Sequence, residues 1–151
     1  MEIAIRPARP EDQDTIVSLI RQAKLNPRNL KWQNFLVAED QGKVVGIRQV
    51  KVYEQGTREI ASGFVLPEYR RQGISAQLMQ ALLARETGAL YTMVNEKRAP
   101  YYEQFGFRRV DVSGLPSDFG KEYRIGRIVT TLMSLFREER VRIVPMRRDK
   151  P

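Results

Sequence analysis

The stretch from residue 60 to residue 82 constrains the fold of this chain more than any other. A strand-like run from Ile60 to Leu66 stops at Pro67, and a short charged turn leads to Gly73. Beyond Gly73, apolar residues recur at the spacing of one helix face, at Ile74, Leu78, Ala81 and Leu82. Gly88 stands where a helix C-cap is expected. The stretch therefore predicts a strand, a tight basic loop and a helix, in that order.

The junction between this strand and this helix suits an anion. The N–H groups of a first helical turn have no partner within the helix, and the helix dipole adds partial positive charge there. Gly73 and the small Ser75 and Ala76 let a ligand approach the backbone, and Arg70 and Arg71 add full charge at the rim. The alternative is an ordinary strand-to-helix turn with a solvated basic loop.

The phrase V-L-P-E-Y-R-R-Q-G-I-S over residues 65–75 resembles the acetyl-CoA-binding signature of the GNAT superfamily of N-acetyltransferases. That signature is written [RQ]-x-x-G-x-[GA], where x is any residue. Arg70 and Gly73 match it, and Ser75 stands where Gly or Ala is usual. The resemblance implies that acetyl-CoA is the co-substrate and that these residues bind it: Phe64, Val65, Leu66, Arg70, Arg71, Gln72, Gly73, Ile74, Ser75 and Ala76.

Two residue types are absent from the sequence, and their absence excludes several kinds of chemistry. Without cysteine the chain has no disulfide, no thiol nucleophile and no thiolate metal ligand. Without histidine it has no Ser-His-Asp or Cys-His catalysis, and it lacks the commonest zinc ligand. We therefore expect no metal cofactor. A length of 151 residues predicts a single domain, 1–151, with its own hydrophobic core.

The sequence is basic, with a formal net charge of +8. Such a charge fits a nucleic acid or, equally, a polyanionic cofactor. The interleaved basic and aromatic surface of a nucleic-acid binder is missing, so nucleic acid is the less favoured partner. Much of the excess lies in the tail, which we interpret as a solvated basic end; its cations are Arg137, Arg140, Arg142, Arg147, Arg148 and Lys150.

No apolar run of the sequence approaches the length of a membrane span, and charge interrupts residues 1–20 throughout. We therefore expect no signal peptide, no membrane contact and, by default, a cytoplasmic protein.

The remaining elements follow from hydrophobic spacing and turn residues. We expect strands at 2–6, about 35–37, 44–53, 58–66, 90–94, 107–112 and 140–146, with a hairpin turn at 38–43. We expect helices at about 10–23, 73–88, 100–106 and 116–136. The strand, helix and strand from 58 to 94 form a βαβ unit, so its two strands should be parallel neighbours. This order is α/β (α+β), a mixed central sheet flanked by helices with an extra helix between the last two strands. It matches the GNAT acyltransferase fold over nearly the whole chain.

Residues 99–107, A-P-Y-Y-E-Q-F-G-F, form the second informative stretch. Pro100 fits a first helical turn and Gly106 fits a C-cap. Tyr101 and Phe105 are spaced i, i+4 and are expected in the core, whereas Tyr102 points about 100° away from Tyr101 and is free to face a pocket. The other interpretation gives both tyrosines a packing role.

The phrase Y-Y-E-Q-F-G-F resembles a GNAT element whose second aromatic is a tyrosine near the acetyl-CoA sulfur. This implies that Tyr102 is the general acid that protonates the leaving thiolate, since a phenol with a pKa of about 10 is protonated at neutral pH. An Asn before this helix is also common in the family and contacts the cofactor, which Asn95 matches. The small residue usual three positions later is replaced by Arg98.

The resemblance implies direct transfer of an acetyl group from acetyl-CoA to a primary amine of a small molecule or protein. The strand at Phe64–Leu66 would pair with the pantetheine amides, and the N–H of Val65 would polarise the thioester carbonyl. With no histidine, the general base must be a carboxylate, and Glu59 on the same strand is the candidate. The alternative for Glu59 is a solvent-facing strand charge.

The acceptor amine is not defined by the sequence. The positive charge favours an acidic or neutral amine, such as an amino acid, over a basic protein tail. Trp32 and Phe35 lie where the family places acceptor contacts, although a core role is the preferred interpretation. Three roles stay open for the extra helix at 116–136: packing against the rest of the fold, shaping the acceptor site, or forming a homodimer contact. Two other functions stay open, a catalytically silent acetyl-CoA sensor and a nucleic-acid-binding protein.

Overall fold

The computed structural model describes residues 2–137 and 140–149. The described residues divide into two compact units, residues 2–51 with 60–86 and residues 52–59 with 87–137 and 140–149. The strands are hydrogen-bonded in the order β1-β2-β3-β4-β5-β7-β6, and β4 contributes to both units. This is a mixed sheet with parallel and antiparallel neighbours, so the predicted fold class is confirmed.

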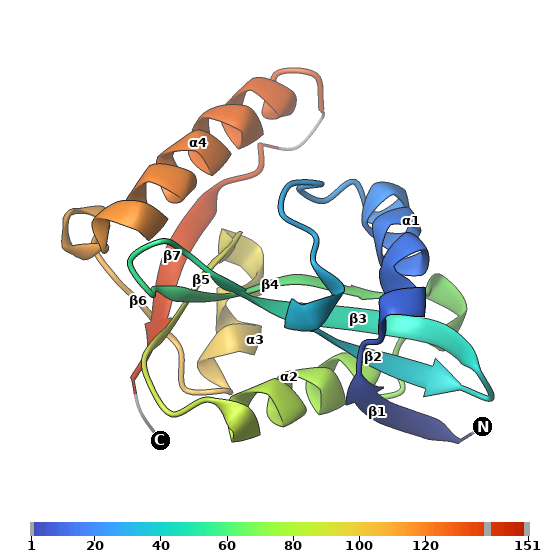
Figure 1. Ribbon diagram of the computed structural model, residues 1–151. Helices are drawn as coiled ribbons and strands as arrows, with labels where there is room; N and C mark the ends of the chain where they lie inside the picture. Colours follow the sequence, from blue (N-terminus) through green and yellow to red (C-terminus); the bar gives the residue numbers. More distant parts are fainter. Residues whose placement is uncertain (1, 138–139, 150–151) are drawn as a thin grey trace. The chain divides into compact units, whose positions relative to one another are not determined.

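The first unit is an antiparallel meander with two helices on its faces. Figure 1 shows α1 and α2 on opposite sides of its strands. Strands β1 and β2 pair with Ile5 opposite Ala38, and β2 pairs with β3 with Val37 opposite Ile47. The elements are β1 Ile3–Pro7, α1 Gln13–Ala23, β2 Phe35–Asp40, β3 Lys43–Val52, β4 Arg58–Val65 and α2 Ile74–Arg85.

A two-residue turn closes the hairpin between β2 and β3. Gln41 and Gly42 have φ angles of 48° and 84°, which is the left-handed pair that a tight hairpin requires. The turn fixes the register that buries the apolar face of β3, where Val45 and Ile47 are fully buried. Phe35 is also buried, so its predicted core role is confirmed, whereas Trp32 is half-buried.

A charged network holds β1 to the start of α1. The guanidinium of Arg6 donates to Asp12 at 2.8 Å and to Glu39 at 2.6 Å. The same Asp12 carboxylate accepts the backbone N–H of Arg9 at 2.7 Å and is only 6% exposed. Because the donors stabilise the charged form, the hydrogen bond from Arg6 first and then that from Arg9 lower the pKa of Asp12 despite burial.

The second unit contains the other three strands and two helices. Its elements are β5 Leu90–Asn95, α3 Ala99–Glu103, β6 Arg108–Arg109, α4 Ser117–Ser134 and β7 Ile143–Arg148. The first residues of β4 belong here, and Glu59 pairs in parallel with Tyr91, which confirms the predicted parallel neighbours. Strand β7 pairs antiparallel with β5 and β6. The extra helix between the last two strands is α4.

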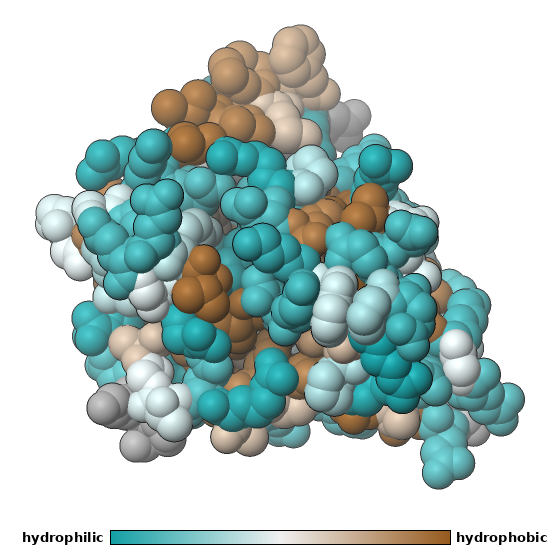
Figure 2. Space-filling view, viewed as in Figure 1, coloured by the Kyte–Doolittle hydropathy of each residue, from teal (hydrophilic) through white to brown (hydrophobic). Residues whose placement is uncertain are grey.

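Helix α4 lies beside β7 (Figure 1). On the inner face, Phe119 and Tyr123 are buried, and Gly126 brings the backbone close to the sulfur of Met93. The hydroxyl of Tyr123 donates to the backbone oxygen of Ile143 at 3.1 Å. The outer face is apolar as well, and Figure 2 shows hydrophobic surface gathered over this helix.

Several predicted boundaries are wrong. Helix α2 ends at Arg85 with Glu86 in an extended conformation, so Gly88 is not its C-cap. Strand β6 holds two residues because Val112 already begins a 3₁₀ turn capped by Asp111. Tyr101 and Phe105 pack edge to face but are half-buried, not part of the core.

The prediction of a solvated basic end is wrong for Arg147 and Arg148. Strand β7 runs two residues further than predicted and includes both. Arg147 donates to the Tyr91 hydroxyl at 3.2 Å, and Arg148 donates to the backbone oxygen of Phe105 at 2.8 Å. These partners hold both arginines half-buried. Lys150 lies outside the described residues.

Among the described residues, no helix is long and apolar enough to cross a membrane. In the same part of the chain, no group of three or more Asp or Glu side chains is arranged to hold a metal ion.

Replacing Arg6 with glutamine should lower the free energy of unfolding by about 3 kcal/mol at pH 7, because Asp12 loses its charged partner. The pKa of Asp12 is lowered in the folded state, so this stabilisation exists above the unfolded-state pKa of about 4. It is lost as the pH falls through the lower folded-state pKa. Urea unfolding of both proteins between pH 7 and pH 2 measures the difference. The exposed Arg9→Gln is the control, and an equal loss in both variants would contradict the assignment.

Candidate functional site

The end of β4 presents backbone groups on two sides. The N–H of Leu66 donates to the oxygen of Val45 at 2.9 Å, which places it toward β3. Because successive N–H groups along a strand point to opposite sides, the N–H of Val65 points away from β3. Val65 and Leu66 are buried and Phe64 is half-buried. This end of the strand therefore has one backbone edge used by β3 and one that β3 does not use.

The loop after β4 is held by its own side chains. A 3₁₀ turn spans Pro67–Tyr69, and the Arg70 Nε donates back to the oxygen of Val65 at 2.9 Å. The Arg70 guanidinium lies over the Phe64 ring, 5.4 Å from its centre. The Tyr69 hydroxyl donates to Asp40 at 2.8 Å, and this hydrogen bond raises the pKa of Tyr69. The basic loop is thus tied to the strand that precedes it.

Two left-handed residues turn this loop into α2. Arg71 has a φ of 63° and Gly73, the N-cap, a φ of 78°. A Cβ atom at Gly73 would meet no atom within 4 Å, so the space next to this Cα is open. The first intrahelical bond runs from the N–H of Gln77 to the oxygen of Gly73. Arg70, Arg71 and Gln72 are exposed around this turn, Ile74 is buried, and Ser75 and Ala76 are half-buried.

A buried arginine on β3 reaches the same helix start. Arg48 is 3% exposed, and its Nη2 donates to the Oγ of Ser75 at 3.2 Å. A Cβ atom at Gly63 would lie 2.4 Å from this nitrogen, so glycine at that position leaves room for the guanidinium. The position where the sequence departs from the GNAT signature, Ser75, is therefore the one that contacts Arg48.

Sequence reasoning missed this polar group inside the first unit. Gln49 is fully buried, and its Nε2 donates to the Oγ of Ser62, whose φ of 60° marks an irregularity in β4. Lys51 on the same strand is 7% exposed. The available signal was three polar residues, Arg48, Gln49 and Lys51, within an otherwise apolar strand. Buried polar residues of this kind are often functional.

Glu59 is buried in the second unit, so its interpretation as a solvent-facing charge is wrong. The carboxylate is 4% exposed and accepts the hydroxyl of Tyr53 at 2.5 Å. Burial first, and then the neighbouring Glu59 carboxylate, raise the pKa of Tyr53. Tyr53 therefore stays protonated over the physiological range and keeps its hydrogen bond to Glu59.

The hairpin that carries this pair is fastened to the start of α4. Asp118 accepts the Thr57 hydroxyl at 2.6 Å and the N–H of Gln55 at 3.1 Å. Although burial raises its pKa, these hydrogen bonds and that from the N–H of Phe119 lower the pKa of Asp118 overall. The ring of Phe119 packs edge-on against Tyr53 at 6.1 Å.

Tyr102 and Asn95 lie elsewhere in the second unit. Tyr102 is half-buried on α3, and its ring packs edge to face on Tyr101 at 5.5 Å and on Phe107 at 5.9 Å. The Asn95 side chain accepts the N–H of Lys97 at 3.1 Å and caps the turn before α3. The catalytic role of Tyr102 and the cofactor contact of Asn95 stay predictions.

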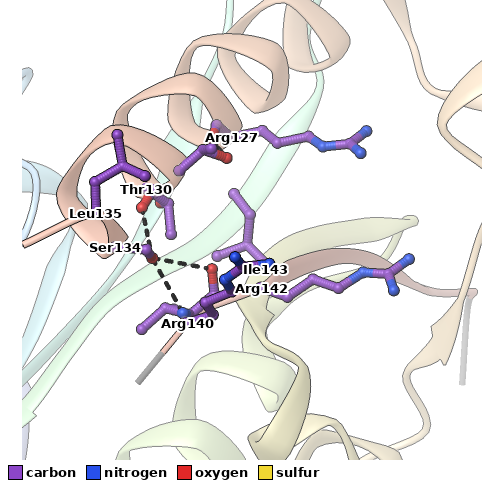
Figure 3. A pocket seen from close by; sticks show the side chains of 9 residues that line it. Arg127, Thr130, Ser134, Leu135, Arg140, Arg142 and Ile143 are labelled. Carbon is purple, nitrogen blue, oxygen red and sulfur yellow. Dashed lines mark hydrogen bonds between the residues drawn. The ribbon is translucent and has the colours of Figure 1, made fainter. Parts of the chain in front are cut away.

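Two neighbouring cavities in the second unit are lined by arginines. The larger, of about 600 Å³, lies between α4 and the chain that enters β7. Figure 3 shows Arg127 and Arg142 with their guanidinium groups extended on one side of it, and the Ser134 hydroxyl bonded to the chain at Val141. The smaller, of about 270 Å³, shares Arg127 and Arg142 and adds Arg109. Glu96 already contacts two of these arginines, Arg109 at 3.1 Å and Arg142 at 3.8 Å. The guanidinium of Arg127, which lines both cavities, suits a carboxylate ligand.

Replacing Tyr53 with phenylalanine should cost about 1.5–3 kcal/mol of stability at pH 7, because it removes a hydrogen bond to a buried carboxylate. The pKa of Tyr53 is raised in the folded state, so this stabilisation exists below the unfolded-state pKa of about 10. It declines as the pH rises above that value. Urea unfolding at pH 7 and pH 11 measures the change. Tyr69→Phe is the matched control and should cost less; equal costs would count against the assignment.

The chain matches the family model described as an acetyltransferase (GNAT) domain over residues 31–109. This match covers β2 through β6 and includes the loop from Arg70 to Ala76. No curated protein matches the chain in sequence.

Solved structures with the same fold include N-acetylglutamate synthase from Neisseria gonorrhoeae in complex with coenzyme A and N-acetyl-glutamate. It is 19% identical with a TM-score of 0.77, and the match covers 100% of this chain and 36% of that one. Rv2747 from Mycobacterium tuberculosis, in complex with CoA and NLQ, is 22% identical with a TM-score of 0.72 and coverages of 98% and 99%. Ard1 from Thermoplasma volcanium is 16% identical with a TM-score of 0.67 and coverages of 100% and 99%.

This chain spans about a third of the Neisseria enzyme and nearly all of Rv2747. At these identities the likeness concerns the fold, and the family assignment rests on the domain match. The predicted fold and the predicted family are both confirmed. The chain belongs to the GNAT acetyltransferase family.

Proposed function

We propose that this protein is an N-acetyltransferase that transfers the acetyl group of acetyl-CoA directly to an amine. The observation that carries the proposal is the open left-handed turn at Gly73, flanked by Arg70 and Arg71 at the start of α2. In an acetyltransferase family, backbone N–H groups at such a turn are the natural site for the pyrophosphate. The bound cofactor supplies an acetyl thioester, an acyl group with a good leaving thiolate.

The strand before the loop would hold the pantetheine arm as an added strand does. The N–H of Val65, on the side of β4 that β3 does not use, is the proposed donor to the thioester carbonyl. A donor fixed by a buried strand needs no reorganisation when negative charge develops on that oxygen. The Leu66 N–H is committed to Val45, which leaves Val65 as the better candidate.

Proton transfer would use the remaining residues. The amine attacks the carbonyl carbon, the C–S bond breaks, and Tyr102 protonates the thiolate. Glu59 is the proposed base for the proton of the amine. Its contact with the Tyr53 hydroxyl at 2.5 Å gives a path by which a buried carboxylate accepts a proton through a neighbouring side chain. In this scheme Tyr53 passes its hydroxyl proton to Glu59 as it takes one from the amine, so Tyr53 ends the step protonated, the state that burial and Glu59 favour by raising its pKa.

We further propose an acceptor amine that carries a carboxylate, such as an amino acid. The net charge of +8 disfavours a basic protein tail. Arg127 lines both cavities of the second unit, where it would pair with an acidic group, next to the Arg109 and Arg142 side chains that contact Glu96. Two of the similar structures hold CoA, one of them with N-acetyl-glutamate.

Calorimetric titration with acetyl-CoA tests the cofactor site. We expect micromolar binding to the wild type and a loss of at least about 100-fold, or about 2.7 kcal/mol, in Gly73→Glu, because the carboxylate occupies the phosphate position. Gly56→Glu is the matched control, since Gly56 is an exposed glycine with a φ of 87° and open space at its Cβ. No binding to the wild type, or equal losses in both variants, would reject the site.

An assay of CoA release over a panel of amines tests catalysis and the acceptor. Amino acids should be acetylated in preference to polyamines and lysine-rich peptides. Tyr102→Phe should lower kcat by about 10²–10⁴-fold with acetyl-CoA affinity unchanged. Tyr101→Phe, one position away on the same short helix, is the control. Binding of acetyl-CoA with no turnover of any amine would favour the sensor function instead.

A further inference from the structure

Arg48 of β3 lies on the face of the strand that α2 covers. A Cβ atom at Gly46, two residues earlier on the same face, would lie 3.3 Å from side-chain atoms of Ile74 and Leu78, so the helix packs directly on β3 there. Arg48 comes next on this face and is 3% exposed. Its side chain is therefore buried beside the first turn of α2, where it meets Ser75.

The guanidinium of Arg48 fits between β4 and the start of α2. Its Nη2 donates to the Oγ of Ser75 at 3.2 Å. A Cβ atom at Gly63 would lie 2.5 Å from the Cζ of Arg48 and 3.0 Å from its Nε, so the guanidinium lies against the backbone of Gly63. Gly63 is directly followed by Phe64 and Val65, in the stretch proposed to hold the pantetheine arm. One buried arginine thus contacts both segments of the proposed cofactor site.

The charge of Arg48 lies in an unfavourable place for a cation. The first turn of a helix carries the positive end of the helix dipole, which favours an anion and disfavours a cation. Arg70 and Arg71 are exposed around the same turn and have the same sign. Burial of the Arg48 guanidinium also costs solvation energy. Like charges gathered around a helix start become favourable when an anion binds there.

Ser75 gives Arg48 a hydrogen-bond acceptor at the position where the sequence departs from the GNAT signature. The glycine or alanine usual at that position has no side-chain atom that can accept a hydrogen bond. A serine there accepts a guanidinium proton, and this bond ties the second residue of α2 to β3. The bond therefore helps to fix the backbone N–H groups of the first turn relative to β3.

We propose that Arg48 is a positioning residue for the diphosphate of acetyl-CoA. It holds the first turn of α2 through Ser75 and adds a buried positive charge behind the backbone N–H groups that bind the phosphates. A buried charge is screened less by water and salt than the exposed charges of Arg70 and Arg71, so it attracts an anion more strongly at the same distance. This inference rests on the proposed function, because it takes the turn at Gly73 as the cofactor site.

Calorimetric titration with three thioesters tests this role. They are acetyl-CoA, 3′-dephospho-acetyl-CoA, which keeps the diphosphate, and acetyl-pantetheine, which carries no phosphate. We expect Arg48→Met to bind both nucleotide thioesters at least about 10-fold more weakly and acetyl-pantetheine as the wild type does. A residue that only stabilises the fold would affect all three alike. Lys51→Met is the matched control, because Lys51 is a buried cation of the same strand on its opposite face, and it should bind all three as the wild type does.

Gly63→Ala gives a second measurement that keeps the charge. The new Cβ would displace the guanidinium, which is the far end of a flexible side chain, so this variant should show the same selective loss as Arg48→Met. Added to Arg48→Met, the alanine should have no further effect, because both changes act on one contact. Urea unfolding establishes that the variants are folded, and Gly63→Ala alone decides if Arg48→Met is not.

Several outcomes would overturn the inference while acetyl-CoA still binds to the wild type. Equal weakening of all three thioesters in Arg48→Met would make Arg48 a structural residue, and no weakening would leave it without a role in binding. The same selective loss in Lys51→Met would assign the effect to net charge instead of position. A wild type that binds none of the three thioesters would reject the proposed function, and this inference with it.

Discussion

The left-handed backbone at Gly73 is the constraint on which the site of the first unit depends. It ends a loop that the Arg70 side chain ties back to β4, and it aims the first turn of α2 into open space. A residue with a Cβ at this φ would be strained, and a large side chain would fill the space that a phosphate needs. Conformational freedom and access thus come from the same missing side chain. Arg48 of β3 contacts this turn by donating a hydrogen bond to the Ser75 hydroxyl.

Most of the fold could be predicted from the sequence where local signals agreed with the tertiary structure. The hairpin turn after β2 and the strand-helix-strand unit each carry a local pattern that packing reinforces. The errors occurred where packing overrode a local signal. The position of Gly88 after the last periodic residue predicts a C-cap there, but α2 ends at Arg85. Arginine is usually solvent-exposed, so Arg147 and Arg148 were predicted in a solvated tail. Hydrogen bonds to Tyr91 and to the backbone of Phe105 instead hold them in β7.

The site was predicted unevenly for a physical reason. Loop residues from Arg70 to Ala76 follow one another in the chain, so spacing and backbone chemistry are visible in the sequence. The contact of Arg48 with Ser75 and Gly63 joins segments 15 or more residues apart, and no pattern along the chain indicates it. The Tyr53–Glu59 pair joins the two strands of a hairpin, and Glu59 is only 4% exposed, which no pattern along the chain indicates.

Helix α4 and β7 are joined at both ends of their contact. Tyr123 bonds the backbone of Ile143, and the Ser134 hydroxyl accepts the N–H of Val141 at 3.1 Å. The helix and the strand are therefore one mechanical element, and β7 is hydrogen-bonded along its length to β5. Tyr91 and Asn95 of β5 lie opposite Arg147 and Ile143 of β7. A substitution that removes either hydrogen bond of α4 therefore acts on the strand that pairs with these two residues.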